Sequence, residues 1–349
     1  MPDMITGTAG VSPVRLLHPD PEAARDDSRL TELGWTLTGR DLMAPPAVFA
    51  VELDSPVARV RGVVAVWDVL DPPVAGGLVP NEQTDARAVR RRTRALRTAH
   101  LDRDPLLLTH RGGGRVGRLV DGAAVPVYEV TDRQRHVRVL QLPDEAGTAV
   151  LADLAGEAYL VADGHHRLAA AVQLRGEGVA SQVTALVVDA DDTPLVLGPI
   201  HRVLLDEQGR DRVDDDTVAS VLDRCRGAGA LVVEHDDAEA GDASVVLVHA
   251  QRRWTVTWPH HPRTDVTTLV EHVLQDTPRS RTRREPDTAV AETAAGHGAL
   301  TCLLPAPDLD EVLALARGGA LLPYKATAFE PKLPPGSLVR PLSAWTPRG

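Results

Sequence analysis

The sequence predicts a mixed α/β (α+β) fold, and three observations lead to this prediction. The chain has 349 residues, of which 43% are hydrophobic and 25% are charged, a balance typical of globular proteins. Apolar segments such as Val60–Trp67 have the composition of strands, whereas Thr84–His100 is rich in Ala and Arg, lacks Pro and Gly, and is typical of a helix. Strands and helices alternate along most of the chain, and its length allows two ordinary domains.

The elements of the first half support this class one by one. Residues 1–46 contain several prolines and no clear period, so the sequence does not place this segment. The helix Thr84–His100 has Thr84 or Asp85 at its N-cap position. The other elements predicted up to Leu154 are the strands Val48–Leu53, Val60–Trp67 and Pro105–Thr109, a turn at Arg111–Arg115, short strands within Val116–Leu140, and Gly147–Leu154 as helix or loop.

The second half alternates more regularly. A strand at Ala158–Ala162 is followed by a turn and by a helix at Leu168–Arg175, which ends at Gly176, a residue typical of helix C-termini. The remaining predicted elements are the strands Gln182–Val188, Leu195–Leu205, Ala230–Glu234, Ser244–His249 and Trp254–Trp258, the helices Asp214–Cys225, Leu269–Gln275 and Asp308–Arg317, a charged loop at Pro278–Asp287, and an irregular end at Leu322–Trp345. The predicted domains are a segment at 1–46, a core at 47–205, an accessory αβ segment at 206–300, and a C-terminal helix and loop at 301–349.

Composition excludes several classes of protein. The two cysteines, Cys225 and Cys302, are too few for a disulfide scaffold or a multi-cysteine metal site. No apolar run approaches the roughly 20 residues that span a bilayer, and residues 1–20 lack the pattern of a secretory signal. We therefore expect a cytoplasmic protein without a membrane partner. The net charge of −11 argues against a general nucleic-acid binder.

The strongest local signal lies at residues 162–167, which read Ala-Asp-Gly-His-His-Arg between a strand and a helix. A helix N-terminus offers unpaired N–H groups and the positive end of the helix dipole, and Gly164 lets a ligand approach the backbone. Two imidazoles and a guanidinium add donors for phosphate oxygens. We therefore predict a phosphate or nucleotide site. The alternatives are a capping Asp163 with surface histidines, or a zinc site, which consecutive helical positions about 100° apart disfavour.

Three further segments carry candidate groups. Glu82 precedes the arginine-rich helix and is either a general base or a helix cap; the arginines are either an anion-steering patch or a solvated face. His201 and Arg202 occupy adjacent positions in an apolar strand and therefore face opposite sides, so one of them can face a site. The alternative is that both lie at an exposed strand end. Residues 322–332 hold both lysines of the chain, Lys325 and Lys332. This segment either delivers Lys325 to a phosphate or is only a C-terminal segment packed on the core. No Walker-A or dinucleotide-binding glycine pattern is present.

Together these segments resemble a known family, the bacterial "domain of unknown function 1015" family. Residues 162–167 match its Ala-Asp-Gly-His-His-Arg motif. Its other three motifs are similar to residues 81–84 followed by Arg92, to residues 200–202, and to residues 323–332, and all four occur in the family order. The chain departs from the pattern at Asn81, where the family has His, and at Ala326, where it has Ser. The missing His removes one donor near Glu82.

The resemblance implies a ParB/sulfiredoxin-like nucleotide-binding core and an activity like that of free serine kinases, which use ATP or ADP with Mg²⁺. The substrate would be a small hydroxyl compound such as a free amino acid, and a homodimer remains open. The residues assigned in this way are Glu82, Asp163 and His166 as catalytic groups, Asp163 as the Mg²⁺ ligand, and Gly164, His165, Arg167, Thr84, Arg92, His201, Arg202, Lys325 and Thr327 as nucleotide or phosphate ligands. The alternatives are a nucleotide-hydrolysing switch that uses CTP or ATP, and a non-catalytic regulatory protein.

Overall fold

The computed structural model describes residues 11–16, 46–73, 77–99, 101–120, 124–177, 182–205, 213–235, 244–259, 261–274, 279–292 and 300–342. The chain divides into two compact units. Unit 1 combines Met1–Pro80, Thr84–Val196 and Phe329–Gly349, and unit 2 combines Asn81–Gln83 with Leu197–Ala328. Within the described ranges, no helix has both the length and the apolar character that crossing a membrane requires. Most of the predicted N-terminal segment lies outside these ranges.

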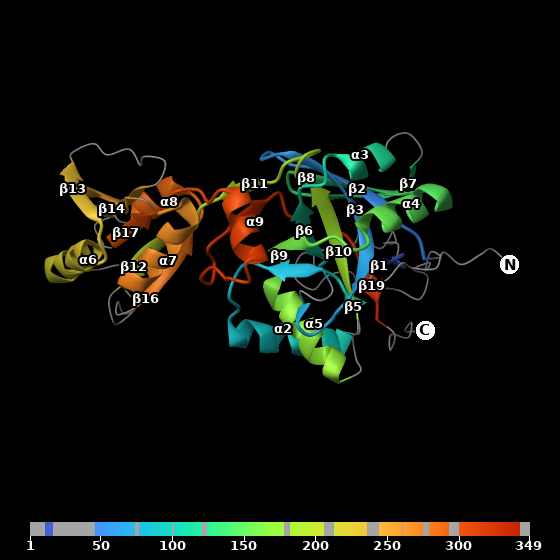
Figure 1. Cartoon of the computed structure of the whole chain (residues 1–349), viewed down its shortest axis with the longest axis horizontal. Helices are drawn as coiled ribbons and strands as arrows, with labels where there is room; N and C mark the ends of the chain where they lie inside the picture. Colours follow the sequence, from blue (N-terminus) through green and yellow to red (C-terminus); the bar gives the residue numbers. More distant parts are fainter. Residues whose placement is uncertain are drawn as a thin grey trace. The chain divides into compact units, whose positions relative to one another are not determined.

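Unit 1 is built on a nine-stranded mixed sheet of order β4-β9-β6-β10-β3-β2-β8-β7, with β1 paired to β3 (Figure 1). Two of its pairs, β6 with β10 and β4 with β9, are parallel, and the others are antiparallel. The strands are β1 (Val11–Ser12), β2 (Phe49–Asp54), β3 (Arg59–Asp68), β4 (Leu78–Pro80), β6 (Leu106–His110), β7 (Val125–Asp132), β8 (Arg135–Gln141), β9 (Tyr159–Asp163) and β10 (Gln182–Asp189).

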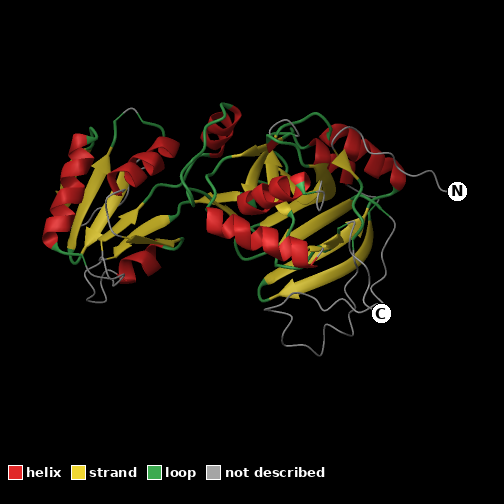
Figure 2. Cartoon of the chain, turned by 90° about the horizontal axis from the view of Figure 1, so that it is seen from below, coloured by secondary structure: helices red, strands yellow, loops and turns green. Residues whose placement is uncertain are grey.

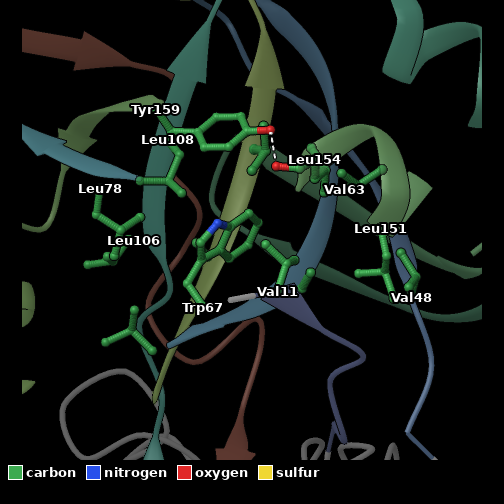
Figure 3. Close-up of a cluster of buried hydrophobic side chains, with 14 of the residues drawn as sticks. Val11, Val48, Val63, Trp67, Leu78, Leu106, Leu108, Leu151, Leu154 and Tyr159 are labelled. Atoms are coloured by element: carbon green, nitrogen blue, oxygen red, sulfur yellow. Dashed lines mark hydrogen bonds between the residues drawn. The ribbon is translucent and has the colours of Figure 1, made fainter. Parts of the chain in front are cut away.

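The core of unit 1 forms where the apolar runs of the central strands meet. Trp67 of β3 and Tyr159 of β9 pack edge to face with ring centroids 5.9 Å apart, and the Tyr159 hydroxyl donates to the Leu154 carbonyl over 3.0 Å (Figure 3). Strands β3 and β10 approach so closely at Gly62 that a Cβ there would lie 2.3 Å from the Val187 carbonyl oxygen. The pairing of β3 with β10 therefore requires glycine at position 62.

Among its described residues, unit 1 contains the helices α2 (Ala86–Ala99), α3 (Arg115–Val120), α4 (Asp144–Leu154) and α5 (His165–Gly176), with α2 packed along α5. The sequence predicts only short strands within Val116–Leu140, and this prediction is wrong where α3 lies. Val116 and Val120 are both buried, and their spacing of four is helical. Gly117 between them concealed this helix, and it is needed because a Cβ would lie 2.3 Å from Asp192 Oδ2.

Unit 2 contains a six-stranded antiparallel sheet of order β13-β15-β14-β17-β12-β16, and helices lie against the strands (Figure 2). Its core includes Trp254, Trp258 and both cysteines, which are free. The elements are β12 (His201–Leu205), α6 (Asp215–Gly227), β13 (Leu231–His235), β14 (Ser244–His249), β15 (Arg252–Thr257), α7 (Arg263–Leu274), β16 (Arg279–Arg283), α8 (Pro286–Glu292), β17 (Leu300–Leu303) and α9 (Leu309–Arg317).

Two expectations for the second half are corrected. Residues 279–283, expected in a loop, form the edge strand β16 beside β12. Their sequence Arg-Ser-Arg-Thr-Arg contains no apolar residue, so nothing in it marks a strand, and β12 supplies the pairing. The C-terminal end, expected to be irregular, contains the short strands β18 (Ala328–Glu330) and β19 (Arg340–Pro341). These pair with β11 (Val196–Gly198) and β5 (Leu101–Asp102), respectively.

Candidate functional site

The Asp-Gly turn joins β9 to α5 in unit 1. Strand β9 ends at Asp163, and Gly164 is the N-cap of α5 with φ of 108°, in the left-handed region that favours glycine. A Cβ at Gly164 would lie 2.6 Å from Leu106 Cδ2 and 3.0 Å from Arg167 Nε. The helix starts with a bond from the Leu168 N–H to the Gly164 carbonyl, 2.9 Å long. Leu106 and Arg167 thus fill the space where a side chain at residue 164 would lie, so the turn at this helix N-terminus requires glycine.

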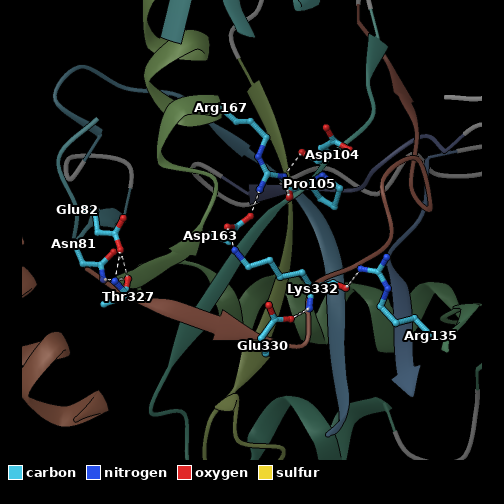
Figure 4. Close-up of polar contacts among 10 residues, drawn as sticks. All are labelled: Asn81, Glu82, Asp104, Pro105, Arg135, Asp163, Arg167, Thr327, Glu330 and Lys332. Carbon is cyan, nitrogen blue, oxygen red and sulfur yellow. Dashed lines mark hydrogen bonds and ion pairs between the residues drawn. The ribbon is translucent and has the colours of Figure 1, made fainter. Parts of the chain in front are cut away.

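The Asp163 carboxylate holds two cations (Figure 4). Its Oδ2 accepts from Arg167 Nη2 and its Oδ1 accepts from Lys332 Nζ. Arg167 also donates through Nη1 to the carbonyls of Asp104, at 2.7 Å, and Pro105. Burial opposes ionisation of Asp163, but Arg167 and Lys332 outweigh it and lower the pKa of this carboxyl below its usual value. The carboxylate thus stays charged and fixes both cations beside the helix N-terminus.

Lys332 was not among the residues that sequence reasoning assigned to the site. Its backbone N–H donates to Glu330 Oε2 at 3.2 Å, and its carbonyl accepts from Arg135 Nη1 at 3.3 Å (Figure 4). These contacts hold the segment after β18 so that the ammonium reaches Asp163. The signal that would have found Lys332 is composition, since only two of the 38 basic residues are lysines and the family motif ends on this one.

Both histidines of the turn are neutral near pH 7. His165 is buried, and burial lowers its pKa to about 4. His166 accepts the backbone N–H of Asp85 at Nε2 over 3.0 Å, so its proton is on Nδ1. Burial lowers the pKa of His166, and Asp85 opposes this shift. The imidazoles therefore supply neutral donors, and the positive charge of the turn comes from Arg167 and Lys332.

Thr84 and Arg92 lie at helix α2. Asp85, not Thr84, caps this helix, because its Oδ1 accepts from the Ala88 N–H at 2.7 Å. Thr84 is exposed. Arg92 is paired with Asp104 at 3.2 Å on the surface.

Glu82 lies in unit 2 within a buried polar group (Figure 4). Its Oε1 accepts from the backbone N–H of Thr327 at 2.6 Å and from the Thr327 hydroxyl. Asn81 donates from Nδ2 to the same hydroxyl at 3.4 Å. The local backbone fixes this arrangement, because the N–H of Leu322 donates to the Asn81 carbonyl over 2.7 Å. The two donors of Thr327 thus fix the position of this carboxylate oxygen, and a general base must be fixed within reach of the proton it takes.

The structure brings Arg202 and Lys325 together in unit 2. Arg202 is 2% exposed and donates from Nε to Glu271 at 2.6 Å and from Nη2 to the Lys325 carbonyl at 3.1 Å. The Lys325 ammonium is exposed and donates to Thr282 Oγ1 at 3.3 Å. An open cavity of about 860 Å³ is lined by these four residues, Arg202, Glu271, Thr282 and Lys325.

His201 is buried, and its Nδ1 accepts the Leu304 N–H at 3.1 Å. Burial, followed by the neighbouring Arg202, lowers its pKa. His201 is therefore neutral near pH 7, and its proton is on Nε2.

The residues around Asp163 fit an anion better than a bare metal ion. Within the described ranges, no three His, Cys, Asp or Glu side chains gather in a way that would hold a metal. Both oxygens of the Asp163 carboxylate already contact cations. The assignment of Mg²⁺ to Asp163 stays a prediction, and no step proposed below uses a metal ion.

With this geometry in hand, comparison with known proteins identifies the family. The sequence profile of the family described as "Protein of unknown function (DUF1015)" matches residues 43–275. The chain belongs to this family. The resemblance seen in its motifs is thereby confirmed. None of the curated proteins matches the chain.

Several solved structures are similar to this chain. A mutant of free serine kinase in complex with AMP has 17% identity and a TM-score of 0.50, over 83% of this chain and 94% of that one. A conserved hypothetical protein from Pyrococcus furiosus has 18% identity and a TM-score of 0.47, over 79% and 95%. SbnI with a C-terminal truncation, from Staphylococcus aureus, has 12% identity and a TM-score of 0.48, over 79% and 87%. The kinase match confirms the predicted fold, and at this identity it shows the fold alone.

Proposed function

We propose that the protein is a small-molecule kinase that transfers a phosphoryl group from ATP or ADP to the hydroxyl of a free amino acid, such as serine. The observation that carries the proposal is the pair of cations, Arg167 and Lys332, that Asp163 fixes at the N-terminus of α5. Phosphoryl transfer is catalysed mainly by positioning and by stabilising charge on phosphate oxygens. The shared fold supports the proposal, because the similar free serine kinase is in complex with AMP.

The turn has the donors that a nucleotide phosphate requires. The backbone N–H groups at the start of α5 offer donors to phosphate oxygens, and the dipole of α5 favours negative charge there. Arg167 and Lys332 neutralise that charge, and His165 and His166 add neutral donors. Asp163 is a catalytic group in this proposal through its hold on the two cations. Thr84 and Arg92, at the start and in the body of α2, serve as supplementary phosphate ligands.

The acceptor hydroxyl requires a base. In the proposed step, the hydroxyl oxygen forms a bond to the terminal phosphorus, and the bond from phosphorus to the bridging oxygen of the nucleotide breaks. The hydroxyl proton passes to the Glu82 carboxylate, and ADP or AMP leaves. The Thr327 backbone N–H and hydroxyl hold Glu82 in position. His201, Arg202, Lys325 and Thr327 stay in the proposal as ligands of the anionic groups of the substrates.

Phosphorus NMR tests the proposal directly. The full-length protein is incubated with Mg²⁺, ADP or ATP, and a mixture of hydroxyl amino acids. We expect a new phosphomonoester signal that is lost, at least 100-fold in rate, in Glu82→Gln, because an amide cannot take the proton. The matched control is Glu234→Gln, which removes an exposed carboxylate paired with Arg252 and should leave the rate unchanged.

Two outcomes would contradict the proposed kinase activity. Hydrolysis of the nucleotide without a phosphomonoester would favour the switch that uses CTP or ATP. Binding of the nucleotide without any turnover would favour a regulatory protein.

A further inference from the structure

Helices α2 and α5 of unit 1 begin side by side and run in the same direction. The Asp85 N–H contacts His166 at 3.0 Å, Thr93 contacts Gln173 at 3.1 Å, and Arg97 contacts Glu177 at 2.7 Å. These contacts advance together along both helices. The two N-termini therefore lie together at the Asp-Gly turn, and the positive ends of both helix dipoles add there.

Four arginines of α2 form one exposed surface. At about 100° per residue, their positions fall within roughly 100° of arc on the helix, opposite the buried Ala88 and Thr93. All four are exposed. We call this surface the arginine stripe; its members are Arg87, Arg90, Arg91 and Arg94.

The charges of the arginine stripe are not neutralised by neighbours. Within the part of the chain that the structure describes, no hydrogen bond or ion pair involves any of the four side chains, whereas Arg92 pairs with Asp104 and Arg97 with Glu177. Like charges three or four residues apart destabilise a helix. The stripe therefore carries an unfavourable concentration of charge that an anion would relieve.

The arginine stripe lies beside the proposed phosphate site. From Arg87 to Arg94 it spans only about 10 Å along the helix axis, and Asp85, the residue that caps α2, contacts His166 in the turn. Burial lowers the pKa of His166, Asp85 raises it, and Arg92 and Arg91 lower it further. The field of Arg91 thus reaches the turn.

The charge of the whole molecule makes such a surface useful. A nucleotide is an anion, and the net charge of −11 opposes its approach. At physiological ionic strength, charges interact over about 8 Å. Acidic residues farther away than this are largely screened. Clefts and surfaces of one sign raise association rates by roughly 10- to 1000-fold in other proteins.

We propose that the arginine stripe guides the phosphate chain of a free nucleoside di- or triphosphate to the Asp163–Arg167 turn. This inference rests on the proposed function for the identity of the ligand. The stripe accelerates the arrival of the nucleotide and does not hold it afterwards, because its side chains are exposed and belong to α2, outside the turn.

Stopped-flow binding of a fluorescent ADP analogue to the full-length protein tests this inference. The variant replaces all four stripe arginines with Gln, which has a good helix propensity. We expect an association rate constant about 10-fold lower at low salt, a dissociation rate constant within about twofold of wild type, and a flatter dependence on ionic strength. The matched control removes four charges far from α2 in sequence and should change the association rate less than about twofold: Arg226, Arg252, Arg253 and Arg317, each to Gln.

The outcomes separate this inference from the proposed function. If the wild-type protein does not bind the analogue at all, the nucleotide site and the guidance inference both fail. If it binds, and the stripe variant keeps the wild-type association rate and salt dependence, only the guidance inference fails. A loss through faster dissociation would make the stripe a holding site and would also overturn the inference. So would a stripe variant that loses binding to a short RNA but keeps the wild-type rate for ADP.

Discussion

At the scale of single residues, Asp163 contributes most to the candidate site. One carboxylate fixes a guanidinium four residues ahead and an ammonium 169 residues ahead. Removing it would leave two cations close together without their partner. Such a group is coupled, and the effects of mutations within it are not additive.

A double-mutant cycle measures this coupling. We expect Asp163→Asn and Lys332→Met each to lower the free energy of unfolding at pH 7 by about 1–3 kcal/mol, and the double variant to lose about 0.5–3 kcal/mol less than the sum. Urea denaturation gives the three values. The control pair, Asp163→Asn with Arg138→Gln, should be additive, because Arg138 bonds Glu52 and Glu129 instead. Additivity in the Asp163–Lys332 cycle would show that the ion pair does not form in solution.

His165 predicts a dependence of stability on pH. Its pKa in the folded protein is lowered to about 4 by burial, from an ordinary value of 6.5. Below pH 6.5 the unfolded chain binds the proton first, so stability is full above pH 6.5 and is lost as the pH falls towards 4. At pH 4.5 this loss is on the order of 2–3 kcal/mol relative to pH 7.

The variant His165→Gln isolates this contribution. It should lose about 2–3 kcal/mol less than wild type between pH 7 and pH 4.5 when both are unfolded with urea. Gly176→Ala provides the control, because it changes no titratable group and should keep the wild-type dependence. An equal loss in wild type and His165→Gln would mean that His165 is not buried as a neutral group.

At the scale of elements, helix α5 has glycines of opposite character at its two ends. Gly164 has a positive φ and no room for a Cβ, whereas a Cβ on Gly176 would meet nothing within 4 Å. We expect Gly164→Ala to cost about 1–3 kcal/mol of stability and to abolish nucleotide binding. Gly176→Ala should be neutral or slightly stabilising. Thermal unfolding with and without ADP measures both; equal behaviour of the two variants would contradict the assigned turn geometry.

Two of the elements that sequence reasoning missed, α3 and β16, share one cause. Helix α3 has only six residues, and Gly117 interrupts its apolar spacing. Strand β16 has no apolar residue and pairs only along one edge. Both elements are stabilised by partners elsewhere in the chain, so their own residues carry little of the signal. In contrast, α5, α6 and α9 were predicted within a few residues, because each has a periodic apolar face and a clear terminal signal.

At the scale of the whole molecule, the chain crosses between its two units several times. Residues 329–349 return to unit 1, which began with the N-terminal part of the chain. Arg340 ties this returning segment down: it is 9% exposed and donates to Thr184 Oγ1 at 2.8 Å and to the Gln182 carbonyl at 2.9 Å. The four-part division drawn from the sequence, the cytoplasmic location and the homodimer stay predictions.

The Arg340 contacts predict that the C-terminal segment is part of the folded core of unit 1. We expect Arg340→Met to lower the free energy of unfolding by about 2–3 kcal/mol, because buried hydrogen bonds from a charged group are lost and Asp102 keeps an unpaired charge. Arg317→Met, at the exposed end of α9, should change it by less than about 0.5 kcal/mol. An unaltered stability of Arg340→Met would indicate that this segment only rests on the surface.

The sequence alone was enough for the mixed α/β class, the family and the Asp-Gly turn at residues 162–167. These follow from local features: apolar periodicity, a glycine after a strand and four short motifs. Only the tertiary structure placed Lys332 on Asp163, Thr327 on Glu82 and Glu271 on Arg202, pairs separated by 169, 245 and 69 residues. Partners so far apart in sequence meet through the path of the whole chain, and local patterns carry no information about that path.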